Sequence, residues 1–112
     1  MELRVEQLNA TITRISPVGR WDVQGAATIN LQLSAIAGSG RRIILDMAEV
    51  DYLSSMGMRS LVMSAKAANA RGGRLVLLSP VGNVADVLVA ASLDQIIPIH
   101  YEIAEAMQAL TA

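Results

Sequence analysis

Two adjacent serines, Ser54 and Ser55, precede Gly57 at the start of a segment whose apolar residues have helical spacing. A serine in this place often caps a helix, because its side-chain oxygen accepts a hydrogen bond from a free backbone N–H of the first turn. A hydroxyl at the end of a helix is also exposed and can accept a phosphoryl group. The helix would tolerate the phosphate, since its free N–H groups and its dipole favour negative charge there. The pair therefore has two interpretations, a helix cap and a phosphorylation site.

Phosphorylation here would change the surface without unfolding the domain. It would add about −1.5 to −2 of charge to a region of sequence that already contains Asp46, Glu49 and Asp51. A partner fitted to a neutral hydroxyl would be expelled by the charge and the bulk of the phosphate. If one serine of the pair is phosphorylated, the predicted consequence is control of protein binding; the alternative interpretation is a helix cap alone.

The other polar residues form no catalytic or metal-binding pattern. Asp46 ends an apolar strand, as the phosphoacceptor of a receiver domain would, but the acidic pair and the strand-end lysine of a receiver are missing. His100 has no second ligand or serine at suitable spacing, and the carboxylates show no acid–base pairing. The glycine-rich turns at 38–40 and 71–73 lack the context of a phosphate-binding loop. We expect no enzyme activity, no cofactor and no metal site.

Composition limits the class of protein. The chain has 112 residues, of which 53% are hydrophobic, and a formal net charge of −1. One domain spanning 1–112 is predicted, and nucleic-acid binding is not, because it needs a concentrated basic face. The absence of cysteine excludes disulfides and thiolate metal sites. The N-terminus does not resemble a signal peptide and no apolar run approaches the length of a membrane span, so a cytoplasmic protein is expected.

Apolar runs and alternation predict the strands. Arg42–Met47 and Arg74–Ser79 are apolar on both faces, as strands covered on both sides are. Ile96–His100 contains Pro98, which cannot donate a ladder hydrogen bond and therefore indicates an edge strand. Two earlier segments alternate as half-exposed strands do, and they read LRVEQ and ATITRIS.

Four segments have the spacing of amphipathic helices. The first should end near the glycines at 38–40 and the second near those at 72–73, where glycine can adopt a left-handed conformation. Their expected buried residues are Ala26, Ile29, Leu33 and Ile36; Met58, Leu61, Val62, Ala65 and Ala68; Val84, Val87, Leu88 and Ala91; Ile103, Met107 and Leu110. The alternation predicts an α/β fold with a mixed, mainly parallel sheet of four or five strands and about four helices.

Three segments resemble the STAS family of anti-sigma-factor antagonists and their relatives: GRWD (Gly19–Asp22), RRIILDMAEVDYLSSMGMRSL and GGRLVLLSP. The resemblance covers about Val5–Leu110 and is most specific at the serine pair. In that family the serine two residues before the glycine is phosphorylated by a partner kinase, which implies Ser55 here. Ser54, the alternative acceptor, stands where many members have aspartate, and Met56 stands where many have serine or alanine.

The resemblance implies a non-enzymatic switching protein. Its unphosphorylated form would bind an anti-sigma factor with a histidine-kinase-like ATPase fold and so release a sigma factor. That serine kinase would phosphorylate Ser55, and a PPM-type serine phosphatase would reverse the modification. The residues expected at the partner surface are Arg20, Trp21, Asp22, Ser54, Ser55, Met56, Gly57, Met58 and Arg59.

Several of these residues have a second interpretation. Asp22 is a candidate N-cap of the first helix. Trp21 could cover the edge of the core or, if exposed, anchor a partner. Arg20 could donate paired hydrogen bonds to a partner carboxylate. Met56 should face outward if Met58 faces inward.

A second hypothesis for the whole domain needs no phosphate cycle. Relatives of this fold serve as constitutive subunits of larger assemblies, such as lipid-transport complexes or stress-signalling scaffolds. The resemblance is compatible with that role as well.

Overall fold

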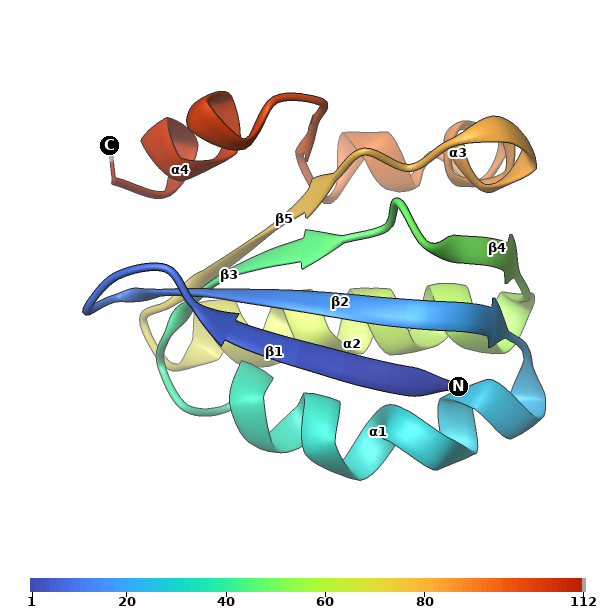
Figure 1. Ribbon diagram of the computed structural model, residues 1–112, viewed down its shortest axis with the longest axis horizontal. Helices are drawn as coiled ribbons and strands as arrows, with labels where there is room; N and C mark the ends of the chain where they lie inside the picture. The colour runs from blue at the N-terminus through green and yellow to red at the C-terminus, as the bar shows by residue number, and fades with distance from the viewer. Residues whose placement is uncertain (112) are drawn as a thin grey trace.

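The computed structural model describes residues 1–111, which contain four α-helices and a six-stranded sheet (Figure 1). The strands are β1 (Glu2–Gln7), β2 (Ile12–Trp21), β3 (Arg42–Asp46), β4 (Val50–Leu53), β5 (Arg74–Leu78) and β6 (Ile99–His100). The helices are α1 (Val23–Ala37), α2 (Ser55–Ala70), α3 (Gly82–Ala90) and α4 (Ile103–Thr111), and a 3-10 turn, η1 (Leu93–Gln95), follows α3. The predicted α/β class and mixed, mainly parallel sheet are confirmed.

The sheet is organised around β2, which has three partners. β1 pairs with it in the antiparallel direction, from Glu2 opposite Val18 to Gln7 opposite Thr13. β3 lies parallel to the first half of β2, and β4 lies parallel to its last residues on the same side (Figure 1). The order across the sheet is β1-β2-β3-β5-β6, with β4 beside β2 only. One long strand therefore connects two regions of the domain.

The sheet has six strands, where four or five were expected, and the strand that was not expected is β4. It has four residues, VDYL, and pairs only with the end of β2, so it is too short to show the alternation that identifies a strand. β2 is also longer than expected, because it continues past Pro17 to Trp21. Residues 16–18 lie between the part of β2 that pairs with β3 and the part that pairs with β4. The donor that Pro17 lacks is therefore not needed by either parallel neighbour.

Different helices cover the two faces of the sheet. α1 and α2 pack against one face, and α4 packs against the other over β3 and β5 (Figure 1). Ile43 and Leu45 belong to the larger core on the side of α1 and α2, whereas Ile44 belongs to the smaller core beneath α4. Successive side chains of a strand point to opposite faces, which explains why the run is apolar throughout.

The ends of several elements agree with their sequence signals. Gly72 follows α2 with a φ of +79°, the left-handed conformation expected after a helix. β6 lies at the edge of the sheet as expected, but it contains only Ile99 and His100 and begins after Pro98, so the expected strand Ile96–His100 was too long. Two residues differ from the expectation of burial: Ala91 and Ile103 are exposed, because the first lies just after α3 and the second begins α4.

Two arginines hold the C-terminal end of α4 against the sheet. Arg42 of β3 donates a hydrogen bond to the backbone oxygen of Leu110, and Arg74 of β5 donates one to the oxygen of Ala109 at 3.4 Å. The last carbonyls of a helix have no intrahelical donor and carry the negative end of the dipole. The two guanidinium groups therefore fasten α4 at the end where it needs donors.

Asp46 and Arg14 form an ion pair on the same face of the sheet as Ile44. Asp46 Oδ2 accepts hydrogen bonds from Arg14 Nε at 3.1 Å and Nη2 at 2.5 Å, and Oδ1 accepts one from the backbone N of Ala48 at 3.0 Å. Asp46 is buried and Arg14 is half-buried. The pair joins β2 to the end of β3.

Replacing Asp46 by alanine should leave Arg14 half-buried without its partner. We expect the free energy of unfolding to fall by about 1–3 kcal/mol, measured by urea denaturation. The control is Glu49→Ala, which removes an exposed pair with Arg4 and should cost less than about 0.5 kcal/mol. Equal effects of the two substitutions would contradict a structural role for Asp46.

Candidate functional site

Two strand-to-helix junctions lie side by side at one end of the sheet. Because β4 pairs with the end of β2, Arg20 lies opposite Tyr52 and Trp21 opposite Leu53. The backbone oxygen of Trp21 accepts hydrogen bonds from the backbone N of Ser54 at 3.0 Å and from its Oγ at 2.9 Å. The turn that leads into α2 is therefore fastened to the turn that leads into α1.

The two serines have different surroundings. Ser54 is the N-cap of α2: its Oγ accepts a hydrogen bond from the backbone N of Gly57 at 3.1 Å while donating to Trp21. Ser55 is the first residue of the helix and is exposed. Within residues 1–111, no side-chain hydrogen bond engages the Ser55 hydroxyl. The cap and the free hydroxyl, which the sequence could not assign, thus belong to Ser54 and Ser55 respectively.

Gly57 allows the first turn of α2 to lie directly on β2 and β4. A Cβ at this position would lie 2.7 Å from Leu53 Cδ1, 2.9 Å from the backbone oxygen of Trp21 and 3.0 Å from Trp21 Cγ. Any side chain would therefore push the helix away from the sheet. Only glycine fits this close approach.

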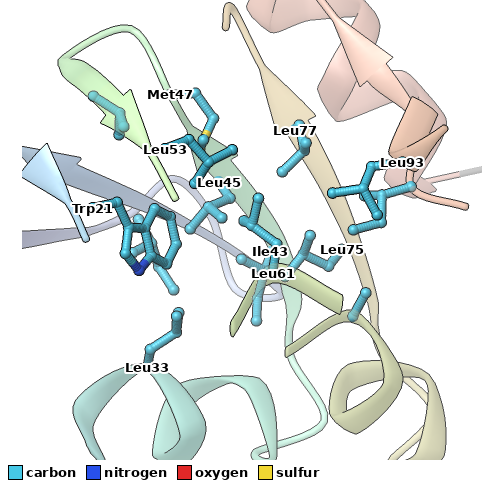
Figure 2. Close-up of a cluster of buried hydrophobic side chains, with 14 of the residues drawn as sticks. Trp21, Leu33, Ile43, Leu45, Met47, Leu53, Leu61, Leu75, Leu77 and Leu93 are labelled. Atoms are coloured by element: carbon cyan, nitrogen blue, oxygen red, sulfur yellow. The ribbon is translucent and has the colours of Figure 1, made fainter. Parts of the chain in front are cut away.

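Trp21 is a core residue, so the hypothesis of an exposed anchor is wrong. Its side chain is fully buried in the larger hydrophobic cluster (Figure 2). The ring lies below Gly57, which is itself buried. Trp21 and Gly57 therefore support the surface from beneath and are not available for direct contact with a partner.

Arg20 and Asp22 form the exposed part of the neighbouring junction. The Arg20 guanidinium lies 3.8 Å from the centroid of the Tyr52 ring, and its Nε donates to Asp22 Oδ2 at 3.2 Å. Asp22 is the N-cap of α1, as expected, with Oδ1 accepting from the backbone N of Gly25 at 2.8 Å. That hydrogen bond, aided by the charge of Arg20, lowers the pKa of Asp22 and outweighs the opposing effect of desolvation.

An apolar groove of about 420 Å³ begins at Ser55 and runs between α2 and the segment after α3. Its lining consists of Ser55, Met58, Arg59, Val62, Met63, Ala91 and Leu93. Met56 lies on the other side of the helix, where a second groove separates α2 from α1. Met56 is exposed and Met58 packs against the core, which confirms their expected directions. Ser55 therefore lies at the rim of an apolar groove that could accept an apolar side chain.

Comparison with known proteins identifies the family of this chain. A model described as the STAS domain matches residues 3–106. The chain belongs to the STAS domain family. Its match to BtrV of Bordetella bronchiseptica, a protein named as an anti-sigma factor antagonist, is 32% identical over 75 residues. That match covers 66% of this chain, and the chain spans 65% of the length of BtrV.

Solved structures share the STAS fold. A Thermotoga maritima protein described as an anti-sigma factor antagonist has a TM-score of 0.87 at 22% identity, over 98% of this chain and 95% of that one. SpoIIAA in its unphosphorylated form has a TM-score of 0.80 at 20% identity, over 98% and 96% of the two chains. The phosphorylated form of SpoIIAA, from Bacillus, has a TM-score of 0.71 at 19% identity, over 96% and 98%. At these identities the likeness establishes the fold.

Some residues were misplaced or missed by sequence reasoning. Asp46, which lies in the same region of sequence as the serine pair, faces the side of the sheet opposite α2 and forms an ion pair with Arg14. Tyr52, which supports Arg20, was missed because β4 was missed. The groove residues Ala91 and Leu93 were missed because they meet α2 only through the tertiary fold.

No group of three or more His, Cys, Asp or Glu side chains within residues 1–111 could hold a metal ion. Over the same residues, no helix is both long and apolar enough to cross a bilayer.

Substitution of the two serines should separate the cap from the free hydroxyl. Ser54→Ala removes the bond to Gly57 and should lower the free energy of unfolding by about 1 kcal/mol. Ser55→Ala removes an unengaged hydroxyl and should change it by less than about 0.5 kcal/mol. Chemical denaturation of both variants measures the difference, and the reverse order would contradict the assignment of the cap.

The lowered pKa of Asp22 predicts a pH-dependent contribution to stability. The folded state binds a proton at this carboxyl less readily than the unfolded state, whose value is near 3.8. The contribution is therefore complete above that value and is lost as the pH falls through the lower, folded pKa. A carbon NMR titration of Asp22 should give a midpoint below 3.8. Asp22→Asn, which can still accept the bond from Gly25, should lose the part of this pH dependence that comes from Asp22, and a midpoint at or above 3.8 would contradict the prediction.

Proposed function

We propose that this STAS protein is an anti-sigma-factor antagonist that acts by partner switching and is controlled by reversible phosphorylation of Ser55. The observation that carries the proposal is the exposed, unengaged hydroxyl of Ser55 at the rim of the apolar groove, beside a Ser54 hydroxyl that is fully used as the cap. The name of BtrV and the two forms of SpoIIAA support it.

The position of Ser55 suits a modification that leaves the fold intact. The cap of α2 is formed by Ser54, so a phosphate on Ser55 removes no hydrogen bond from the helix. Free backbone N–H groups and the positive end of the helix dipole are close to the first residue. The added charge is therefore accommodated by the domain itself and is felt by whatever docks on it.

The proposed cycle has two chemical steps. An anti-sigma factor with a histidine-kinase-like ATPase fold transfers the γ-phosphoryl group of ATP to Ser55 Oγ; the new Oγ–P bond replaces the bond to ADP, and a base on the kinase takes the hydroxyl proton. A PPM-type serine phosphatase hydrolyses the Oγ–P bond with water and restores the hydroxyl. We propose that the chain and these partners act in the cytoplasm.

The unphosphorylated form is the one that binds the anti-sigma factor and so frees the sigma factor. The partner would cover Ser55, Met56, Met58 and Arg59 on the first turns of α2. It would also cover Arg20 and Asp22 on the adjacent junction. Trp21, Ser54 and Gly57 hold this surface in place from beneath. A phosphate in the covered area would leave a charge without a partner, which is costly in an interface.

The first test is phosphorylation of the purified chain by its cognate serine kinase and ATP, followed by intact mass spectrometry. One phosphate should be added to the native chain and to Ser54→Ala, and none to Ser55→Ala. Incorporation that persists in Ser55→Ala, or is lost only in Ser54→Ala, would reject Ser55 as the acceptor.

The second test measures binding to the same kinase by calorimetry. Ser55→Asp should weaken the complex by about 1–3 kcal/mol, because it buries a charged group without a matching partner. Ser55→Asn is the control of nearly equal volume without the charge, and it should weaken the complex less. Equal affinity of Ser55→Asp and the native chain, with no phosphate on protein isolated from its host, would favour a constitutive subunit.

A further inference from the structure

Arg59 differs from most arginines of the chain. Six others donate hydrogen bonds to protein groups that fix their position: Arg4, Arg14, Arg20, Arg41, Arg42 and Arg74. Arg59 is exposed, and no hydrogen bond or ion pair engages it within residues 1–111. Its guanidinium is therefore available to a charge that arrives from outside the folded chain.

The position of Arg59 relative to Ser55 makes this availability specific. The two residues are four positions apart on α2 and line the same apolar groove, so their side chains are neighbours on one face of the helix. A helical side chain also leans toward the N-terminus of its helix, which directs Arg59 toward Ser55. Lys66 and Arg71 are also without an ion pair among the described residues, but they lie roughly 16 and 24 Å farther along the axis than Ser55.

No acidic residue of α2 competes for the guanidinium. The sixteen residues of the helix read SMGMRSLVMSAKAANA and contain no aspartate or glutamate. The rest of the groove that Ser55 and Arg59 share is apolar, so a phosphate on Ser55 has one cation within a helical turn and no anion on its own helix.

We infer that Arg59 pairs with the phosphate of modified Ser55. This inference rests on the proposed function and names the residue through which the modification acts. The guanidinium donates two N–H groups to phosphate oxygens, and an acid four positions before a cation is the favoured order on a helix. Phosphorylation then changes the surface of α2 in two ways. It adds a phosphate at the rim of the groove, and it engages the guanidinium of Arg59, which is otherwise free.

The deciding experiment uses the full chain with phosphoserine incorporated at position 55 during translation. Phosphorus NMR gives the second pKa of the phosphate, whose ordinary value is about 6. Because a neighbouring cation favours the dianion, the second pKa should be lower in the native background than in Arg59→Gln, by about 0.2–0.4. Arg59→Lys should keep part of that difference.

Lys66→Gln is the matched control, since it removes a cation of α2 that lies three turns away. It should leave the second pKa unchanged. An equal pKa in the native, Arg59→Gln and Lys66→Gln backgrounds would overturn the inference, because the helix N-terminus alone would then hold the phosphate. Thermal melts of the exposed-site variants verify that each is folded.

The measurement of the second pKa does not require the proposed function to be correct. The phosphate is placed by synthesis, so the pairing is measured whether or not a kinase modifies Ser55 in the host. Native protein that never carries phosphate would reject the proposed function, whereas an unchanged second pKa in Arg59→Gln would reject only the role of Arg59.

Discussion

The contact between the first turn of α2 and Trp21 is the interaction on which the site depends. The backbone oxygen of Trp21 takes two hydrogen bonds from Ser54, and the indole lies where a side chain at Gly57 would be. These contacts fix the height and the direction of the helix relative to the sheet. They also fix where the next residue, Ser55, emerges, because a residue at the start of a helix has little freedom once the cap is formed.

The two adjacent serines provide one hydroxyl that caps α2 and one hydroxyl that is free, which a single serine could not do. A hydroxyl that caps a helix is already bonded and half-buried, so its modification would cost the cap. A hydroxyl one residue later is outside the cap and remains free. The fold thus separates the residue that stabilises the helix, Ser54, from the residue whose hydroxyl is free, Ser55, and the proposed phosphorylation of Ser55 would leave the cap in place.

The sequence predicted those parts of the fold that have strong local signals. The doubly apolar runs of β3 and β5, the glycine after α2 and the proline that indicates an edge strand each have one physical interpretation, and the α/β class follows from the order of the elements. β4 could not be predicted, because its four residues become a strand only through pairing with the end of β2. The length of β2 could not be predicted for a related reason. Pro17 is acceptable within β2 because it lies between the residues that pair with β3 and those that pair with β4, and the sequence does not show these pairings.

The same limit applies to the site. Spacing and family resemblance indicated the junction and its residues, but burial decides their roles, and burial is a property of the assembled core. Trp21 is an example: the sequence left it as either a cover for the core or an exposed anchor, and its complete burial in the larger cluster with Leu53 makes it part of the core. Asp46 is another, because the alternation of β3 turns it away from α2 and toward Arg14.

The division of β2 at Pro17 has a consequence for the evolution of such domains. The residues before it hold β3, the ion pair of Asp46 and, through Arg42, the last helix. Those after it hold β4 and the two junctions, and Val18 also pairs with Glu2 of β1. Substitutions after Pro17 can therefore alter the two junctions while β3, the Asp46–Arg14 pair and α4 keep their contacts, so duplicated copies of such a domain can diverge at one end of the strand and retain a common scaffold at the other.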